Sequence, residues 1–185
     1  MTASSFEAGV RRRLEPSRGL PKGTGMTDRV AGDDRVHVER DAEGYNRAVA
    51  GVALAEGEVL AAFGARETLR APNYLTVQTG PDRHILLAPE HLQYINHSCD
   101  PNLFFDTARM EIVTLRAIPA GEEFTFFYPS TEWSMDRAFD CHCGSGECIG
   151  TVTGADELGA WSLARHRFNR HILDALAMRT DTVMA

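Results

Sequence analysis

Apolar and polar residues alternate along many short stretches of this chain, which is the pattern of half-buried β-strands. The stretches are bounded by Gly, Pro, Asn or Asp, the residues typical of turns. The pattern predicts strands over residues 35–40, 45–52, 58–63, 73–79, 83–88, 102–106, 109–118 and 123–128. Many short strands with no long helices between them indicate a mostly β domain.

The last of these stretches, "EFTFFY", carries aromatic residues on both faces of the predicted strand. A strand with one solvated face would alternate with polar residues instead. The second face therefore also needs apolar neighbours, which a channel or a chain lying across it would provide. Aromatic walls attract ammonium and methylated ammonium groups through cation–π interactions. This makes Tyr128, at the end of the stretch, a candidate for binding such a group.

The two ends of the chain differ from this strand pattern. Residues 1–33 are rich in Pro, Gly and Ser and have no apolar period, which predicts a flexible leader. Between Asp156 and about Met178, apolar residues recur at helical spacing, which predicts a C-terminal helical tail over 155–185.

The net charge of the chain is −7, and it is unevenly distributed. Residues 1–33 hold six basic and four acidic side chains, which leaves −9 on the remainder. Contacts with phosphates require clustered Lys and Arg, so no direct nucleic-acid partner is expected. An acidic body favours a basic protein or peptide, chiefly by steering the encounter. No apolar run approaches the roughly 20 residues of a membrane span, and no secretory signal is recognisable, so we expect a cytoplasmic protein without a membrane partner. The oligomeric state stays open.

Three of the four cysteines form the compact motif Cys141-x-Cys143-x4-Cys148. In a cytoplasmic protein such a cluster indicates metal binding or catalysis more than disulfides. The glycines around it let the backbone wrap a small ion, and thiolates are ligands of tetrahedral Zn²⁺. Cys99 is the only other cysteine and could supply the fourth ligand. A site with four thiolates is closed, so the zinc ion would be structural and would pin this segment onto the stretch around Cys99.

Three motifs follow one another in the order "YINHSCDPN", "IPAGEEFTFFY" and "CHCGSGECIG". Together they resemble the SET-domain protein lysine methyltransferases that carry a post-SET zinc segment. The resemblance implies a SET fold of several small sheets with a pseudoknot, a zinc-stapled post-SET segment and a C-terminal helix. It places the SET domain at 34–130 and the post-SET segment at 131–154. It also implies S-adenosylmethionine as the cofactor, and a basic protein or peptide carrying the target lysine as the substrate.

The resemblance also assigns cofactor contacts to particular residues. Asn96 would bind near the methionyl amino group of S-adenosylmethionine. His97 would lie beside the adenine and contact it largely through its backbone. Tyr94 would belong to the same site, and Phe139 would pack on the adenine ring.

The same resemblance assigns the catalytic position and the metal ligands. Tyr128 would stand at the methyl-transfer channel, where it would contact the cofactor and orient the lysine amine toward the methyl group. Phe126 would occupy the position that influences how many methyl groups are added. The zinc ligands would be Cys99, Cys141, Cys143 and Cys148.

The chain departs from the family pattern at two places. The family's usual Gly-x-Gly is replaced by Tyr45-Asn46-Arg47, and the usual acidic residue before the tyrosine is Phe127. The first departure supports an alternative function, a non-catalytic module of the same fold that holds a basic peptide. The retained Asn96, His97 and Tyr128 favour the enzyme.

Overall fold

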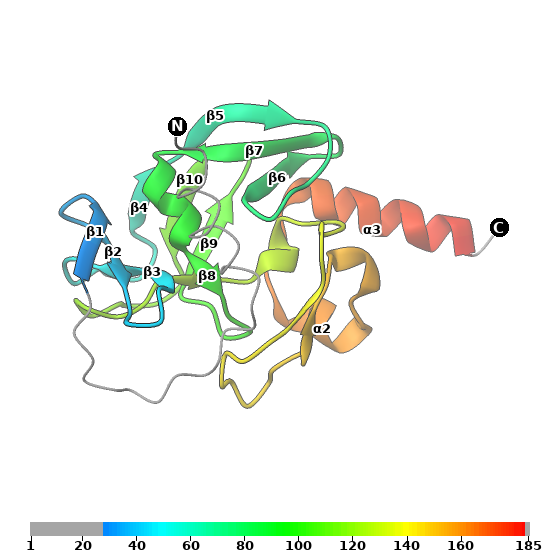
Figure 1. The fold of residues 1–185 in the computed structure, drawn as a ribbon. Helices are drawn as coiled ribbons and strands as arrows, with labels where there is room; N and C mark the ends of the chain where they lie inside the picture. The colour runs from blue at the N-terminus through cyan, green and yellow to red at the C-terminus, as the bar shows by residue number, and fades with distance from the viewer. Residues whose placement is uncertain (1–27, 184–185) are drawn as a thin grey trace.

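The computed structural model describes residues 28–183 (Figure 1). Residues 1–27 of the predicted leader lie outside the described residues. The last part of the predicted leader contains a strand, β1 (Asp28–Gly32), which pairs antiparallel with β2 (Val36–Arg40). The first sheet therefore begins before the boundary that the sequence pattern places after residue 33.

The described chain is mostly β, as predicted, and its strands form four small sheets (Figure 1). One has the order β1-β2-β3, with β3 at Asn46–Ala50. Another has the order β5-β7-β6, with β5 at Gly64–Leu69, β6 at Thr76–Gly80 and β7 at Arg83–Ala88. A two-stranded sheet joins β12 (Phe139–Asp140) to β13 (Thr151–Val152).

The central sheet has five strands in the order β4-β10-β9-β11-β8. Its strands are β4 (Val59–Ala62), β8 (Asn96–His97), β9 (Leu103–Asp106), β10 (Glu111–Thr114) and β11 (Thr125–Phe126). Strand β11 runs parallel to both β8 and β9, with Thr125 opposite Asn96 and Phe126 opposite His97. Parallel neighbours cannot be joined by a tight hairpin, so this pairing brings distant segments together. It sets the Asn96-His97 strand directly beside the strand that leads to Tyr128.

The main core lies against the central sheet and is built from the apolar faces of the short strands. Phe105 on β9 is fully buried, and its ring centroid lies 5.3 Å from that of Phe63 and 4.4 Å from that of Phe126. Aromatic rings at these separations add to the hydrophobic stabilisation of the core. Two short 3-10 helices, η2 (Glu90–Tyr94) and η3 (Tyr128–Ser130), lie beside this core. Tyr94, the last residue of η2, and Tyr128, the first residue of η3, pack against it.

The C-terminal part of the chain covers Phe127, the residue that follows β11. Phe127 is 2% exposed and belongs to a second apolar cluster with Phe168 and Ile172. The aromatic residues of "EFTFFY" therefore pack in two apolar clusters, and Phe127 is covered by the C-terminal segment of the same protein. The expectation that this face needs apolar neighbours, from a channel or a chain lying across it, is met at Phe127 by the C-terminal part of the same chain.

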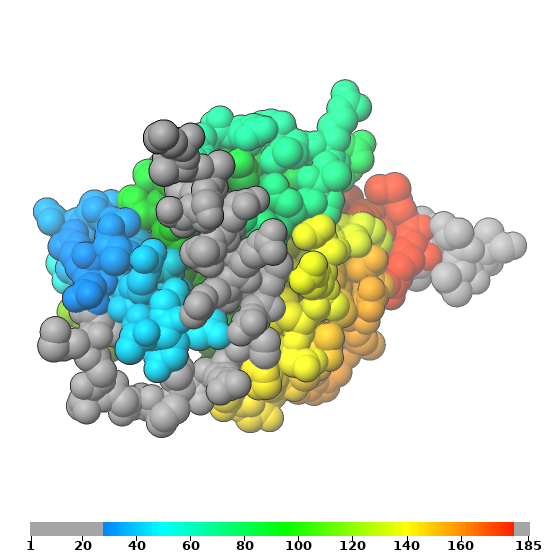
Figure 2. Space-filling view, in the orientation of Figure 1, coloured from blue at the N-terminus to red at the C-terminus, as the bar shows by residue number. Residues whose placement is uncertain are grey.

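The predicted helical tail is divided into η4 (Ala155–Glu157), α2 (Ala160–Arg165) and α3 (Arg170–Val183). Buried Asn169 stands before α3 and ties it to the body. Its Nδ2 donates to the carbonyls of Phe105 and Ser130, and its Oδ1 accepts from the backbone and hydroxyl of Thr107. In Figure 1 the C-terminal end of α3 projects away from the sheets, and in Figure 2 the coloured part of this helix (red) lies at the right-hand side of the molecule. No helix within residues 28–183 is long and apolar enough to cross a membrane.

Candidate active site

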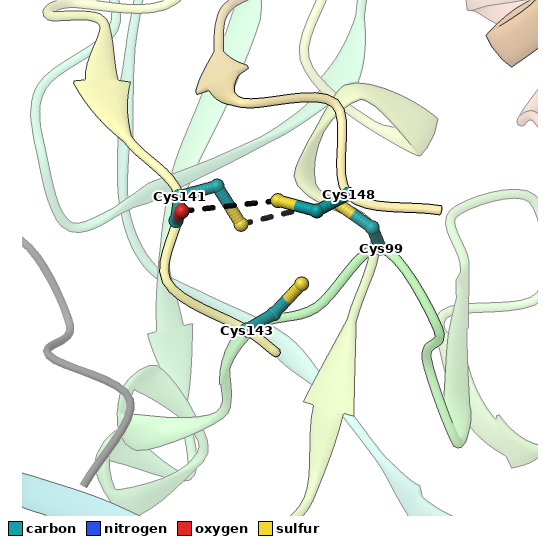
Figure 3. Close-up of side chains that lie close together, drawn as sticks. All are labelled: Cys99, Cys141, Cys143 and Cys148. Carbon is teal, nitrogen blue, oxygen red and sulfur yellow. Dashed lines mark hydrogen bonds between the residues drawn. The ribbon is translucent and has the colours of Figure 1, made fainter. Parts of the chain in front are cut away.

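The four cysteines converge from two separate segments (Figure 3). Cys99 follows β8, and the other three lie in the loop between β12 and β13. Their sulfur atoms all lie within 4.8 Å of one another, and the Sγ atoms of Cys99 and Cys141 are 3.7 Å apart. A tetrahedron with Zn–S bonds of ~2.3 Å has S···S edges of about 3.8 Å, so the donor set and its spacing fit Zn²⁺.

Nitrogen atoms surround the sulfurs of this cluster. The backbone N–H of Ile149 donates to Cys99 Sγ over 3.4 Å, and His97 Nε2 lies 3.3 Å from the same sulfur. The N–H of Gly150 donates to Cys148 Sγ over 3.4 Å. The sulfurs of Cys99 and Cys148 thus accept hydrogen bonds from backbone N–H groups of the same loop. His142, between two of the cysteines, is exposed and lies outside the cluster.

Asn96 holds its side-chain amide between two acceptors. Its Nδ2 donates to Glu123 Oε1 over 2.9 Å and to the backbone carbonyl of Asn46 over 3.3 Å. An amide nitrogen has two N–H donors, so both are used by these partners. Within the described residues, Asn96 Oδ1 therefore stays available to accept a hydrogen bond from a ligand.

Charged residues occupy the region where the family's Gly-x-Gly is missing. Burial raises the pKa of Glu123, while the hydrogen bond from Asn96 and the nearby charge of Arg47 lower it. Arg47 also pairs with Glu39 at 2.9 Å. Gly44, just before β3, has a φ of +88°, a conformation that favours glycine. A glycine-dependent turn is thus present at this point, and Asn46 contributes its carbonyl to Asn96.

His97 lies in an aromatic environment beside Tyr128. Its ring centroid is 5.2 Å from the ring of Tyr128, 5.6 Å from that of Phe127 and 6.2 Å from that of Phe139. Burial, and then the nearby His166, lowers the pKa of His97 to about 3. The imidazole is therefore neutral at neutral pH. The backbone N–H of Tyr128 donates to His97 Nδ1 over 3.2 Å.

Tyr128 is half-buried at the start of η3. Its hydroxyl donates to the carbonyl of Ile95 over 3.4 Å, which is a long hydrogen bond. Its ring lies 4.7 Å from that of Phe126 and 6.1 Å from that of Phe139. The phenol oxygen is thus held next to a backbone carbonyl and among aromatic rings, where it can contact an amine.

The structure therefore brings together most of the residues that the resemblance assigns to the site: Asn96, His97, Phe126, Tyr128 and Phe139. Tyr94, at the end of η2, is half-buried and packs against the main core, one residue before the carbonyl that faces Tyr128. Sequence reasoning did not assign Glu123 or Ile95. Glu123 lies in the motif "GEEF", but nothing local shows its contact with Asn96, which depends on the parallel pairing of β11 with β8.

This fold and site define a SET domain with an attached segment whose three cysteines meet Cys99 of the domain. A family model described as "SET domain" matches residues 21–129, more than half of the chain. The protein therefore belongs to the SET-domain family. The match ends just after Tyr128, so the motif from Cys141 to Cys148 and the C-terminal helices lie beyond it.

Named methyltransferases are among the similar proteins. "Methyltransferase flvH" of Aspergillus flavus is 41% identical over 134 residues, which are 71% of this chain and 75% of that protein. A protein named histone-lysine N-methyltransferase, H3 lysine-36 specific, from Cryptococcus neoformans is 35% identical over 99 residues. Its namesake from Saccharomyces cerevisiae is 31% identical over 111 residues. The chain covers only 11% and 14% of the lengths of these two histone methyltransferases.

Proposed function

We propose that this protein transfers a methyl group from S-adenosylmethionine to the side-chain amine of a lysine in a basic protein or peptide. The observation that carries the proposal is the placement of Tyr128. Its hydroxyl faces the Ile95 carbonyl, and it stands beside the Asn96-His97 strand within the SET domain. Relatives named methyltransferases support the reaction class.

The cofactor would be held by the residues along β8 and β12. Asn96 Oδ1 fits the methionyl ammonium group, because an ammonium only donates hydrogen bonds and this oxygen can accept one. The adenine would lie beside the backbone of His97, with Phe139 packed on it. Tyr94 would complete this side of the site. The carboxylate of Glu123, next to Asn96, adds negative charge on the side that would receive the ammonium.

The amine must be neutral to react, although free lysine titrates near ~10.4. An apolar channel disfavours the charged form and so lowers the pKa of the bound lysine. The buried ring of Phe126 and the half-buried ring of Tyr128 provide such walls. When bound, S-adenosylmethionine supplies a methyl group on a sulfonium, which the amine lone pair displaces in line as the carbon–sulfur bond breaks. Tyr128 would orient the amine through its hydroxyl, and Phe126 would influence the number of methyl groups.

The cysteine cluster would hold one structural Zn²⁺. Cys99, Cys141, Cys143 and Cys148 complete a tetrahedral set without an open position, which excludes a substrate ligand at the metal. The zinc would fasten the post-SET segment, proposed at 131–154, onto the end of β8. Phe139 lies in that segment, so the zinc would also hold one wall of the cofactor site.

The substrate class follows from charge and from the relatives. The chain has a net charge of −7, which suits a basic partner. Several relatives are named histone-lysine methyltransferases, so histones and histone-like proteins are the first substrates to test. The alternative is a non-catalytic module that binds a basic peptide. It requires that the cofactor site be lost where Tyr45-Asn46-Arg47 replace the glycines.

The deciding experiment is titration calorimetry of zinc-loaded protein with S-adenosylmethionine, using wild type and Asn96→Ala. We expect binding near micromolar affinity, weakened at least about tenfold in the variant, or roughly 1.4 kcal/mol. Thermal melting of both proteins would check that the variant is folded. No binding by folded, zinc-loaded wild type, with or without a basic peptide present, would favour the binding module.

The reaction itself is tested with labelled cofactor and a panel of histones and lysine peptides. Tyr128→Phe should lower kcat strongly and leave cofactor affinity within a few-fold, since it removes only the orienting hydroxyl. Equal activity of Tyr128→Phe and wild type would contradict the role given to Tyr128.

A further inference from the structure

The imidazole of His97 has a different partner on each ring nitrogen. Nδ1 lies 3.2 Å from the backbone nitrogen of Tyr128, and Nε2 lies 3.3 Å from Cys99 Sγ. A backbone N–H can only donate, so Nδ1 must be the nitrogen without a proton. In the neutral ring the proton is then on Nε2, where it points at the sulfur of Cys99. The hydrogen-bond partners alone assign this tautomer.

Cys99 Sγ receives a second donor from the other side. The backbone N–H of Ile149, within the post-SET loop, approaches the same sulfur over 3.4 Å. Cys99 is buried, so water does not replace either donor. A metal-bound cysteine sulfur carries no hydrogen and only accepts, so two N–H groups directed at Cys99 Sγ suit a metal ligand. The surroundings of Cys99 thus match a metal ligand supported by a histidine N–H.

Only one orientation of the His97 ring satisfies both contacts. A ring flip that exchanged the nitrogens with carbons would remove the acceptor from Tyr128 and the donor from Cys99. The opposite tautomer would place an N–H against the N–H of Tyr128. The aromatic rings of Phe127 and Phe139 pack around the imidazole and leave little freedom for such movement. The ring is therefore a rigid link between a cysteine of the metal cluster and the backbone of Tyr128.

We propose that His97 is a positioning residue that couples the metal centre to Tyr128. Binding of the metal by Cys99 keeps the sulfur an acceptor, the acceptor holds the Nε2–H tautomer, and Nδ1 then holds the backbone N–H of Tyr128. This role of the His97 side chain is separate from the contact with adenine that is proposed for the His97 backbone. It rests on the proposed function in assigning Zn²⁺ to the cysteines and catalysis to Tyr128. Loss of the metal would therefore loosen Tyr128 through His97.

Two substitutions separate the two halves of this link. In His97→Asn, the amide oxygen can take the place of Nδ1 and accept from Tyr128, but no N–H reaches Cys99. In His97→Gln, the longer side chain can direct its N–H toward Cys99, while the acceptor for Tyr128 is lost. His142→Asn is the matched control, because His142 is exposed and adjacent to two cysteines but outside the cluster.

The first measurement is Zn²⁺ affinity by competition with a chelator, together with the thiolate-to-metal absorption of the Co²⁺-loaded proteins. His97→Asn should weaken zinc binding about 10- to 100-fold, the usual effect of removing such a supporting contact, and should shift the absorption band. His97→Gln should stay closer to wild type in zinc affinity, and His142→Asn should match wild type. An unchanged affinity and spectrum in His97→Asn would overturn the link to the metal.

The second measurement is the His97 tautomer by ¹⁵N NMR of wild-type protein, which needs no variant to fold. Zinc-loaded protein should show the proton on Nε2, and removal of the metal should perturb the His97 signals. A proton on Nδ1 in the zinc-loaded protein would refute the proposal.

Kinetics then test the second half of the link, the contact with Tyr128. His97→Gln should lower kcat more than it raises KM for the cofactor, because it disturbs Tyr128 and leaves the backbone of β8 in place. A kcat equal to that of wild type would refute this half.

These readouts separate the coupling from the proposed function. Zinc affinity and tautomer require no methyl transfer, so a protein without methyltransferase activity could still show the link between His97 and Cys99. An active enzyme with the proton on Nδ1 would keep the proposed function and overturn the coupling alone.

Discussion

Glu132→Gln should make the protein more stable at alkaline pH and change its stability much less at acidic pH. Glu132 follows η3 and is 7% exposed. Its Oε1 accepts from the backbone N–H of Gln78 over 2.8 Å and from the hydroxyl of Thr131 over 3.0 Å. Its Oε2 lies 4.0 Å from Nδ1 of His84, which is also buried. Burial lowers the pKa of His84, which disfavours a positive charge on this neighbour that would offset the burial of the carboxylate.

The sign follows from the raised pKa. Burial raises the pKa of Glu132 from 4.5 to about 7, against the lowering effect of its two hydrogen bonds. Between these pH values the folded protein keeps a proton that the unfolded chain has lost. The contribution of Glu132 to stability is therefore greatest below pH 4.5 and falls as pH rises toward 7. The full shift corresponds to a loss of about 3 kcal/mol. Glutamine keeps the shape and the accepting oxygen but never ionises, so the variant avoids this loss.

The assay is urea unfolding of wild type and Glu132→Gln at several pH values between about 5 and 8.5, in zinc-containing buffer. The stability difference should grow from about 1 kcal/mol at the acidic end to about 3 kcal/mol at the alkaline end. Burial also lowers the pKa values of His84 and His171, which gives both proteins an opposite slope that cancels in the difference. Glu67→Gln, at an exposed position, should show no such trend. A constant difference between wild type and Glu132→Gln would refute the reasoning.

Three further predictions concern the frame of the site. Asn169→Ala should lower the free energy of unfolding in urea by about 3 kcal/mol or more, because it leaves several backbone groups without their hydrogen-bond partners. A decrease below about 1 kcal/mol would contradict this. Phe105→Ala should cost about 3–5 kcal/mol, since its fully buried ring fills the main core; melting close to wild type would show that the core collapses around the gap. Cys148→Ser, or a chelator, should raise the rate of amide hydrogen exchange in residues 139–152 more than in the central sheet. A loop that has no core of its own and is held by a metal loses its folding energy with the metal. An equal rise in exchange throughout the protein would argue against such a local role of the metal.

Much of the fold could be predicted where a local pattern determines the structure. In β2 the buried Val36 and Val38 alternate with more exposed residues, as expected for a strand with one covered face. The cysteine motif and Cys99 meet in space, because glycine-rich spacing and the total of four cysteines leave few other arrangements. The four small residues of "AVAG" and the aromatic run near Tyr128 also mark strands, although the second is shorter than predicted. Thr125–Phe126 alone form the strand β11, Glu123 makes an isolated bridge with Val49, and Tyr128 already begins η3.

The remaining features depend on contacts between distant segments. Strand β5 was not predicted, because its four consecutive exposed residues give no alternation and its only neighbour is β7. His84 on β7 is buried against Glu132, which lies far from it in the sequence. In the same way, Glu123 reaches Asn96 only through the parallel pairing of β11 with β8. No local pattern reports such contacts.

The replacement of the family's usual acidic residue by Phe127 is explained by the tail beyond the family match. The ring of His166 stacks on Phe127 with a centroid distance of 3.7 Å and an interplanar angle of 6°. The same imidazole lies 3.1 Å from the carbonyl of Cys99 through Nε2 and 2.9 Å from the carbonyl of Ser162 through Nδ1. A carboxylate at position 127 would be desolvated in this apolar cluster, whereas a phenyl ring gains a stacking partner. The residue before Tyr128, the first cysteine of the cluster and the start of the C-terminal helices are thus packed on one another. The C-terminal segment therefore forms part of the frame that holds Tyr128.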